Sequence, residues 1–328
     1  MSVPFIAFLG PSGTYAETAC HQLAQAQGLR DHTPRSGLSI QHVLHQLKAD
    51  HGGDGTVVAA VVPVENSVQG GVTATLDTLW SLSAPCCPPD SSNPYGPQGL
   101  EIVRGLVLPI RHALLGSART EDISEVISHP QALGQCSTWL NKHLPQALQL
   151  PTTSTAEAAR MVKGSRFRGA IASLDAAREQ DLSVLAYPIN DEPNNCTRFL
   201  LVQPVDATTC SSAPSTPPDH TVMTSLCFAL RQRDRPGALV EALQVFHEQA
   251  LNMSRIESRP AKTDLGKYVF FVDVEGHYQT AAFQKALHKV YPICEQLLNF
   301  GSYPVMTVSP EESEAQFANR RNGIANTT

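Results

Sequence analysis

The chain has 328 residues, of which 42% are apolar and only 16% are charged, and its formal net charge is -6 at pH 7. This length exceeds what one hydrophobic core usually organises, so we expect two or three domains. The low content of charged residues excludes long disordered acidic or basic arms. The absence of any basic run argues against nucleic acid as a partner, because phosphate binding draws on clustered Lys and Arg.

No stretch of the sequence approaches the ~20 consecutive apolar residues that a membrane-spanning helix needs, so we expect no membrane partner. The N-terminus has neither a basic region followed by a long apolar stretch nor a composition rich in Arg and Ser, so no secretory signal or transit peptide is predicted. The eight cysteines are scattered, without a C-x-x-C pair or zinc-type Cys/His spacing. Together these features favour a cytoplasmic protein with reduced thiols and no metal site.

Short apolar runs alternate with helical patterns through the first 205 residues. This alternation is typical of α/β layers, and the continuous run at 57–62 (VVAAVV) predicts a strand buried on both faces. In chain order, the patterns predict strands at 6–9, 57–62, 102–109, 113–116, 125–128, 170–172 and 197–202. Helices are predicted at 15–27, 73–82, 131–141, 155–163 and 173–179.

Two segments rich in Pro and Ser interrupt this pattern. Residues 84–99 predict an inserted surface loop, and residues 206–221 have the composition of a linker, where we place a domain boundary. Beyond it, the predicted elements of residues 222–308 follow the β-α-β-β-α-β order of a ferredoxin-like domain. Its strands are expected at 225–231, 253–258, 268–274 and 303–308, and its helices at 236–249 and 280–298. The polar residues 309–328 predict a flexible tail.

Two polar loops follow predicted strands in the first half of the chain. Ser12 and Gly13 belong to a Gly-Pro-Ser-Gly-Thr turn that enters the first helix, where free N–H groups can bind an anion. Its spacing is not that of a dinucleotide fingerprint, and an ordinary capped turn explains it equally well. Glu65, Asn66 and Ser67 come directly after the buried strand, where ligands bind in open α/β sheets, although a capped loop is the alternative.

Two further strand-to-helix junctions carry side chains suited to hydrogen bonding. His129 could supply a proton near neutral pH or could simply hold the entry to its helix. Thr153 and Ser154 belong to a run of four hydroxyl residues at a helix start, of which capping accounts for one. These junctions are therefore candidate substrate contacts.

The segment Thr197-Arg198-Phe199 begins the last strand before the linker. The planar guanidinium of Arg198 suits a carboxylate, although a surface ion pair on an edge strand is the alternative. Taken together, the candidate loops are rich in hydroxyl, amide, Gly and Arg groups and poor in Cys/His/Asp clusters. This composition favours binding of a small, multiply acidic molecule over metal-dependent hydrolysis.

These motifs, taken as a set, resemble prephenate dehydratases. The segments IAFLGPSGTYAE, VVPVENSVQGGV, ISHPQALGQC, TTSTAEAA, GAIAS and NNCTRF follow the order and approximate spacing of that family. The C-terminal third resembles an ACT domain, in which the phenylalanine-binding motifs correspond to Gly237, Ala238, Leu239, Val240, Glu257, Ser258, Arg259 and Pro260. Two departures are the 84–99 insertion, which puts the nearby rim of the site in doubt, and Ser67 where the family often has Thr.

The resemblance implies an α/β catalytic region at residues 1–205 made of two lobes, like a periplasmic binding protein. The lobes span roughly 1–110 with 189–205, and 111–188, with the active site between them. It also implies a homodimer or homotetramer that joins partly through ACT domains. L-phenylalanine bound there would favour a closed, less active state.

The implied reaction converts prephenate to phenylpyruvate by loss of CO2 and water. Aromatisation of the ring supplies the driving force, so no cofactor is expected. Thr197 and Arg198 would be the catalytic positions, with Thr197 at the leaving hydroxyl and Arg198 on a substrate carboxylate. The substrate-binding positions would be Ser12, Gly13, Glu65, Asn66, Ser67, His129, Thr153, Ser154 and Phe199.

Two other functions stay open on the sequence. An arogenate dehydratase would act on the amino analogue of prephenate, and the absence of a visible transit peptide favours prephenate. A non-catalytic amino-acid-sensing protein could use the same two lobes and ACT domain, but the intact Thr197-Arg198-Phe199 segment argues against it.

Overall fold

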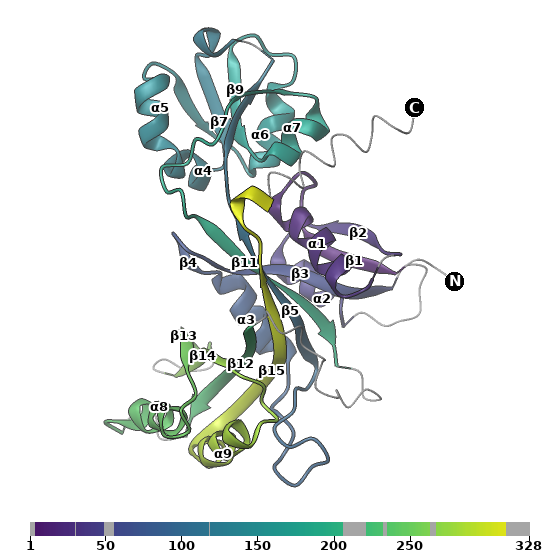
Figure 1. The fold of residues 1–328 in the computed structure, drawn as a ribbon, viewed down its shortest axis with the longest axis vertical. Helices are drawn as coiled ribbons and strands as arrows, with labels where there is room; N and C mark the ends of the chain where they lie inside the picture. The colour runs from purple at the N-terminus through teal and green to yellow at the C-terminus, as the bar shows by residue number, and fades with distance from the viewer. Residues whose placement is uncertain are drawn as a thin grey trace.

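The computed structural model describes residues 4–29, 31–48, 56–117, 119–205, 221–231, 235–262 and 267–312. These residues form an elongated molecule of three parts stacked along its longest axis (Figure 1). A first α/β lobe lies in the middle, a second α/β lobe at one end and the C-terminal domain at the other. Most of the linker expected at 206–221 and of the tail expected at 309–328 lies outside the described residues.

The first lobe is built around β3 (Val57–Asn66), whose apolar run is buried as the sequence predicts. Its sheet has the order β5-β11-β3-β1-β2, in which β1, β2 and β3 are parallel and β11 is antiparallel to β3 and β5. The other strands are β1 (Phe5–Leu9), β2 (Thr33–Gly37), β4 (Gly70–Gly71), β5 (Leu100–Pro109) and β11 (Cys196–Pro204). The helices are α1 (Tyr15–Ala26), α2 (Ile40–His45) and α3 (Thr73–Leu82).

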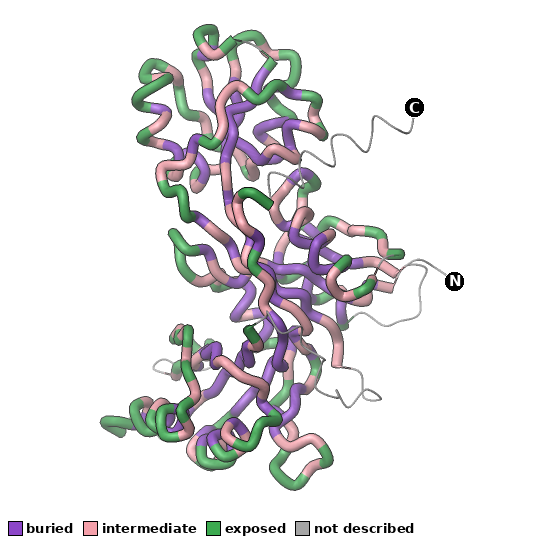
Figure 2. Tube along the Cα trace, viewed as in Figure 1, coloured by how far each residue is buried: buried purple, intermediate pink, exposed green. Residues whose placement is uncertain are grey.

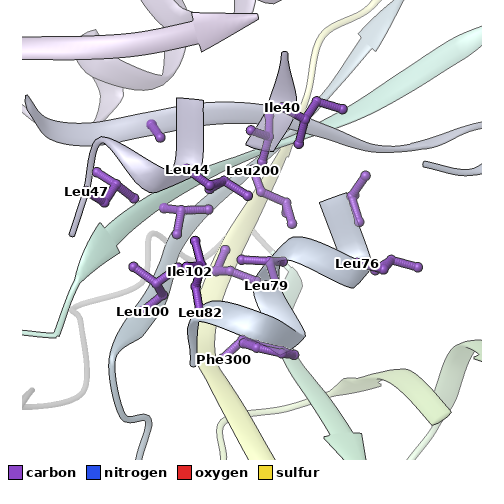
Figure 3. Packing of buried hydrophobic residues seen from close by; sticks show 14 of the residues in the cluster. Ile40, Leu44, Leu47, Leu76, Leu79, Leu82, Leu100, Ile102, Leu200 and Phe300 are labelled. Carbon is purple, nitrogen blue, oxygen red and sulfur yellow. The ribbon is translucent and has the colours of Figure 1, made fainter. Parts of the chain in front are cut away.

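Helices cover both faces of this sheet. Ile6 and Phe8 of β1 pack in one buried cluster with side chains of α1, whereas Ala7 belongs to the cluster on the opposite face with α2 and α3. Leucines of α2 and α3 meet Ile102 and Leu200 of the sheet and Phe300 of the C-terminal domain in that second cluster (Figure 3). One hydrophobic core therefore spans the first lobe and the C-terminal domain.

The second lobe carries a separate five-stranded sheet of order β10-β6-β9-β7-β8. The expected helix at 131–141 is divided at Cys136, whose backbone leaves the helical region (φ -122°, ψ 13°). The strands are β6 (Ala113–Gly116), β7 (Glu125–Ser128), β8 (Leu148–Pro151), β9 (Arg168–Ala172) and β10 (Ser183–Ala186). The helices are η1 (Thr120–Asp122), α4 (Pro130–Gln135), α5 (Ser137–His143), α6 (Thr155–Val162) and α7 (Leu174–Gln180).

The C-terminal domain has the predicted β-α-β-β-α-β order. The helix expected at 280–298 is wrong beyond Val290. Pro292 has no N–H for the next α-helical hydrogen bond, so the chain passes through a short 3-10 turn, and Cys294 already begins a strand. The strands are β12 (Thr221–Leu230), β13 (Met253–Pro260), β14 (Tyr268–Glu275) and β15 (Cys294–Thr307). The helices are α8 (Ala238–Glu248), α9 (Ala281–Val290) and η2 (Tyr291–Ile293). In the described part of the chain, no helix is long and apolar enough to cross a bilayer.

The strand β15 joins the C-terminal domain to the first lobe. Its first part pairs with β12, and its last residues pair in parallel with β5, from Val305 opposite Gly105 to Thr307 opposite Val107. The left-handed backbone of Gly301 (φ +98°) lies where the register with β12 shifts, as expected for a bulge. The result is one 10-stranded sheet, and Figure 2 shows buried residues continuing along it from one part to the other.

The inserted loop at 84–99 lies against the C-terminal domain, and none of its residues lines the cleft between the lobes. The backbone N–H of Cys86 donates to the carbonyl of Leu297 (2.8 Å), and the Asn299 amide donates to the carbonyl of Tyr95 (2.8 Å). Tyr95 is only 2% exposed and belongs to the core of that domain. The loop is therefore a second connection between the two parts and does not form the rim of the site.

Candidate active site

A cleft of about 630 Å³ lies between the two lobes. The first lobe contributes the β1–α1 turn, the β3–β4 turn, the start of α3 and the beginning of β11, while the second contributes α4 and the start of α6. Six of the expected site residues line it: Asn66, His129, Thr153, Ser154, Thr197 and Phe199. Five do not line it: Ser12, Gly13, Glu65, Ser67 and Arg198.

Asn66 and Thr197 form the centre of the cleft wall, directly opposite each other on β3 and β11. The Asn66 side-chain oxygen accepts the backbone N–H groups of Val68 and Gln69, each at 3.1 Å, so its nitrogen must face β11. That nitrogen donates to the Thr197 hydroxyl at 3.0 Å. Since the Thr197 oxygen accepts this bond, its own hydrogen is available for donation to a ligand.

A chain of neutral groups extends this pair into the second lobe. The Asn66 nitrogen also donates to the side-chain oxygen of Asn195 (2.8 Å), whose nitrogen donates to Gln135 Oε1 (3.1 Å). The Nε2 atom of His112 lies 3.1 Å from the same Gln135 oxygen, which can only accept, so this nitrogen carries a hydrogen. Burial lowers the pKa of His112, although its bond to Gln135 acts in the opposite direction. The imidazole is therefore neutral near neutral pH.

Sequence reasoning missed three members of this chain: His112, Gln135 and Asn195. Gln135 and Asn195 lie inside the segments ISHPQALGQC and NNCTRF, so the motifs pointed to the right stretches but not to the right side chains. His112 follows β5 without any motif of its own. Only the packing of the two lobes brings these three residues to one place.

Tyr15 was also missed and ties the lobes together at the cleft. Its hydroxyl hydrogen-bonds the carbonyl of Arg111 and accepts the Arg111 N–H at 3.1 Å. Burial raises the pKa of the Tyr15 hydroxyl, so the group stays protonated. Tyr15 thus lines the cleft and also fixes the backbone at Arg111, where the chain passes from the first lobe to the second.

His129, Thr153 and Ser154 come from the second lobe. His129 is the N-cap of α4, where its Nδ1 accepts the N–H of Gln131 at 3.3 Å, and its ring also lines the cleft. Ser154 caps α6 by accepting the N–H of Glu157 at 3.0 Å, so its hydroxyl already has a structural role. Thr153 is exposed at the rim.

The first glycine-rich turn contributes other residues than expected. Gly10, Thr14 and Tyr15 line the cleft, whereas Ser12 is exposed outside it. The Gly13 carbonyl accepts the Ser173 hydroxyl of the second lobe at 2.9 Å. Gly13 has φ +81°, and a Cβ there would meet a Glu179 carboxylate oxygen at 2.8 Å. Gly13 therefore lies where the two lobes touch and does not line the cleft, and its left-handed backbone is one that other residues rarely adopt.

Ser67 also has a structural position, because its hydroxyl accepts the backbone N–H of Cys196 at 3.0 Å. This bond holds the β3–β4 turn against the start of β11. Ser67 is exposed and does not line the cleft.

Arg198 and Glu65 lie on the other side of the sheet, because neighbouring strand residues alternate in direction. The Arg198 guanidinium pairs with Glu65 Oε2 at 3.0 Å and with the Asp273 carboxylate of the C-terminal domain. Asp273 also accepts Arg255 Nε at 2.9 Å. Burial opposes ionisation of Asp273, but Arg198 and Arg255 hold the pKa of that carboxyl below its usual range. The expectation that Arg198 holds a substrate carboxylate does not fit these contacts.

The residues expected to bind phenylalanine are divided in the structure. Gly237, Ala238, Leu239 and Val240 line a pocket of about 220 Å³ together with Tyr268 and Phe270. Glu257 pairs with Arg255 at 3.1 Å, and Arg259 pairs with Asp77 of α3 at 3.2 Å, so both face the first lobe. Ser258 and Pro260 are exposed on the outer side of β13. Within one chain, the two motifs do not meet at one pocket.

The part of the chain that the structure describes contains no group of three or more His, Cys, Asp or Glu side chains that could hold a metal ion.

The fold and the cleft define a two-lobed α/β protein with a C-terminal domain of the ferredoxin-like β-α-β-β-α-β order. The sequence matches the prephenate dehydratase family over residues 6–207 and the ACT domain family over residues 229–290. The prephenate dehydratase of Mycobacterium sp. (strain JLS) is 34% identical over 322 residues, which are 95% of this chain and 94% of that protein. The chain belongs to the prephenate dehydratase family.

Two solved structures resemble the fold closely. A prephenate dehydratase from Arthrobacter aurescens in complex with L-Phe has a TM-score of 0.73 and 33% identity, and the match covers 98% of each chain. GqqA, described as a novel type of quorum quenching acylase, has a TM-score of 0.72 and 27% identity, covering 94% of this chain and 99% of that one. The predicted fold, and the predicted function as a carbon–oxygen lyase of phenylalanine biosynthesis, are confirmed.

Proposed function

We propose that the cleft between the lobes carries out the reaction, with Thr197 as the hydrogen-bond donor to the departing hydroxyl. The observation that carries this proposal is the bond from Asn66 to Thr197, whose direction is set by the Val68 and Gln69 N–H groups. A threonine that already accepts a hydrogen bond from Asn66 presents its hydrogen to the substrate. The accepted bond disfavours orientations in which the hydroxyl hydrogen points back at Asn66.

The reaction breaks two bonds of prephenate. The electron pair of the ring–carboxylate bond moves into the ring as CO2 leaves, and the ring hydroxyl leaves with its bonding pair. One proton from solvent converts the departing hydroxide to water. Thr197 is too weak an acid to be the final source of this proton, but its hydrogen bond strengthens as negative charge grows on the leaving oxygen.

The cleft is suited to an anionic substrate without a fixed cation. Its lining, as far as the structure describes it, contains no Arg or Lys. The starts of α3 and α6 both line the cleft, and free N–H groups at helix starts attract carboxylates. The ring carboxylate is the group that leaves as CO2. Without a cation beside it this loss is favoured, because an ion pair would stabilise the negative charge that the reaction removes. Phe199 offers an apolar face to the ring.

We further propose that L-phenylalanine binds at the pocket of Gly237 to Val240 and that a second copy of the chain completes this site. The resemblance to ACT motifs and the Arthrobacter aurescens complex support this assignment. Val240 and Tyr268 are 64% and 50% exposed at the pocket, as expected for a surface that pairs with another copy. A homodimer or homotetramer would follow from this pairing.

The test compares substrates directly. Purified protein is incubated with prephenate and with arogenate, and phenylpyruvate and phenylalanine formation give kcat/KM for each. A higher value on prephenate supports the proposal, and a higher value on arogenate would favour that alternative. No turnover of either substrate would favour a sensor protein. Phenylalanine is then titrated, with inhibition as the expected result.

A further inference from the structure

We propose that Arg198 is a positioning residue that ties the strands of the active site to the ACT domain, so that movement of the ACT sheet changes the placement of Thr197 and Asn66. This inference rests on the proposed function of the cleft. It goes beyond that function because it gives the ACT domain a physical route to the reacting groups. It also assigns Arg198 a role other than binding substrate.

The strand register places a charged pair directly beside the two cleft residues. Arg198 follows Thr197 on β11, and Glu65 precedes Asn66 on β3, with Arg198 directly opposite Glu65. Thr197 and Asn66 face the cleft, while Arg198 and Glu65 form an ion pair of 3.0 Å on the other face. Because the backbone is shared, a shift of the ion pair shifts the two cleft residues as well.

The Asp273 carboxylate is buried between two arginines. Its side chain is 2% exposed, and it lies between Arg198 and Arg255, which are 11% and 10% exposed. The other carboxylate oxygen accepts the Ser225 hydroxyl at 2.6 Å. A buried carboxylate that loses its cations is strongly destabilised, so Arg198 must follow Asp273 when β14 moves. The pair therefore transmits motion and does not merely join two surfaces.

A second set of contacts leads from Arg255 back to the wall of the cleft. Arg255 also binds Glu257 of β13 at 3.1 Å. The Glu257 carboxylate lies directly on the backbone of Gly71, where a Cβ would come within 1.9 Å of its Oε2 atom. Gly71 lines the cleft and pairs with Glu65. The charged groups thus reach both edges of β3, and the ACT strand β13 contacts the cleft wall itself.

A role in substrate binding makes a different demand on Arg198. Its guanidinium would have to leave Asp273 and Glu65, turn through the sheet and enter the cleft, and a buried carboxylate would remain behind. The two roles differ in their kinetics. A substrate-binding Arg mainly affects KM, whereas a positioning residue affects kcat and the response to the regulator.

The experiment uses the full chain with Arg198→Met, Asp273→Asn and the double variant. We expect Arg198→Met to lower kcat on the order of tenfold with KM for prephenate changed less than about threefold. Asp273→Asn loses the charge partner in the ACT domain but leaves the Arg198–Glu65 pair in place, so it should lower kcat less than Arg198→Met does and raise the phenylalanine concentration for half-inhibition on the order of tenfold. In the double variant, neither the fall in kcat nor the rise in the phenylalanine concentration for half-inhibition should exceed that of the more affected single variant, because both changes break the same contact.

The matched control is Lys262→Met. Lys262 also bridges the ACT domain and the first lobe, pairing with Asp77 at 2.7 Å, but this contact does not reach β11. We expect kcat and the phenylalanine response to stay within about twofold, because Lys262 itself is exposed and Asp77 keeps its pair with Arg259. Thermal melting checks the fold of each variant. If Arg198→Met does not fold, Arg198→Lys and Glu65→Gln replace it, with the same split between kcat and KM.

Several outcomes would overturn the inference while leaving the proposed function in place. One is a KM raised tenfold or more in Arg198→Met with an unchanged phenylalanine response, which would assign Arg198 to the substrate. Changes of kcat or of the phenylalanine response that multiply in the double variant would also contradict a connection from Asp273 through Arg198 to the cleft. So would an active wild-type enzyme that phenylalanine does not inhibit. Failure of the wild-type enzyme to convert prephenate would instead refute the proposed function.

Discussion

The two faces of the sheet at β11 are built from different chemistry. On the cleft side, Thr197 and Asn66 continue into a chain of neutral amides that ends at an uncharged imidazole. On the ACT side, Arg198 and Asp273 belong to a cluster of full charges that also includes Arg255. Apart from this cluster, the loop at 84–99 packs on the ACT domain through Tyr95. The difference indicates a division of labour. The cleft wall is built from neutral groups, so the charges there come from the bound substrate. At the junction, meaning the contact between the first lobe and the ACT domain, buried charges and packing hold the two domains in a fixed arrangement.

The largest effect is expected at the junction, from Tyr95→Ala. This ring is buried in the ACT core, and its removal should lower the free energy of unfolding by about 3 kcal/mol, as for other buried aromatic residues. Chemical unfolding measures the change. Tyr95→Phe is the control, since it keeps the ring and loses only the hydroxyl bond to His288 at 3.0 Å, with a loss near 1 kcal/mol. Equal stability of Tyr95→Ala and wild type would show that the loop is not docked.

In the cleft, Thr197→Ala should lower kcat on the order of 10²-fold, because it removes a donor that acts mainly in the transition state. Thr197→Ser keeps the hydroxyl and should retain most of the activity. Steady-state rates on prephenate measure both. A near-normal kcat in the alanine variant would remove Thr197 from the mechanism.

A smaller effect on the same side is expected from Asn66→Asp. A carboxylate cannot donate to Thr197 and would instead accept its hydrogen, so kcat should fall on the order of tenfold or more. Ser12→Ala is the comparison, since Ser12 lies outside the cleft and its loss should change kcat less than about twofold. A large loss in Ser12→Ala would show that the β1–α1 turn touches substrate after all.

The smallest effect concerns how the free energy of unfolding depends on pH through His112, the last of the hydrogen-bonded neutral groups beside the cleft. The pKa of the His112 imidazole is lowered in the folded protein. The stabilising contribution of the neutral imidazole is therefore fully present at pH values above about 6.5, the ordinary pKa of histidine. This contribution is lost as pH falls from there through the lowered pKa, because the unfolded chain takes up the proton first. Unfolding measured across this window should show a shallower pH slope for His112→Asn than for wild type. Identical slopes would place the charge change elsewhere.

The sequence by itself determined the α/β pattern, the ferredoxin-like order of the last third and the stretches that surround the cleft. Apolar periodicity suffices for elements such as β3 and α3, because these bury a regular face. It failed for β2 (Thr33–Gly37) and α2 (Ile40–His45), which are short and take their places from parallel pairing with β1 and packing on α3. It also missed the strand at Cys294–Leu298, which β12 holds in place through pairing.

Only the tertiary structure decided which polar residues face the substrate. Thr197 and Arg198 are neighbours in one motif, yet strand alternation sends one into the cleft and the other into the ACT domain. His112, Gln135 and Asn195 meet because two lobes close around them, and no local pattern records that contact. Likewise the composition of residues 84–99 is that of a loop, but the burial of Tyr95 depends on a domain more than a hundred residues away in the chain. Local sequence sets local conformation, whereas long-range packing assigns each side chain its partner.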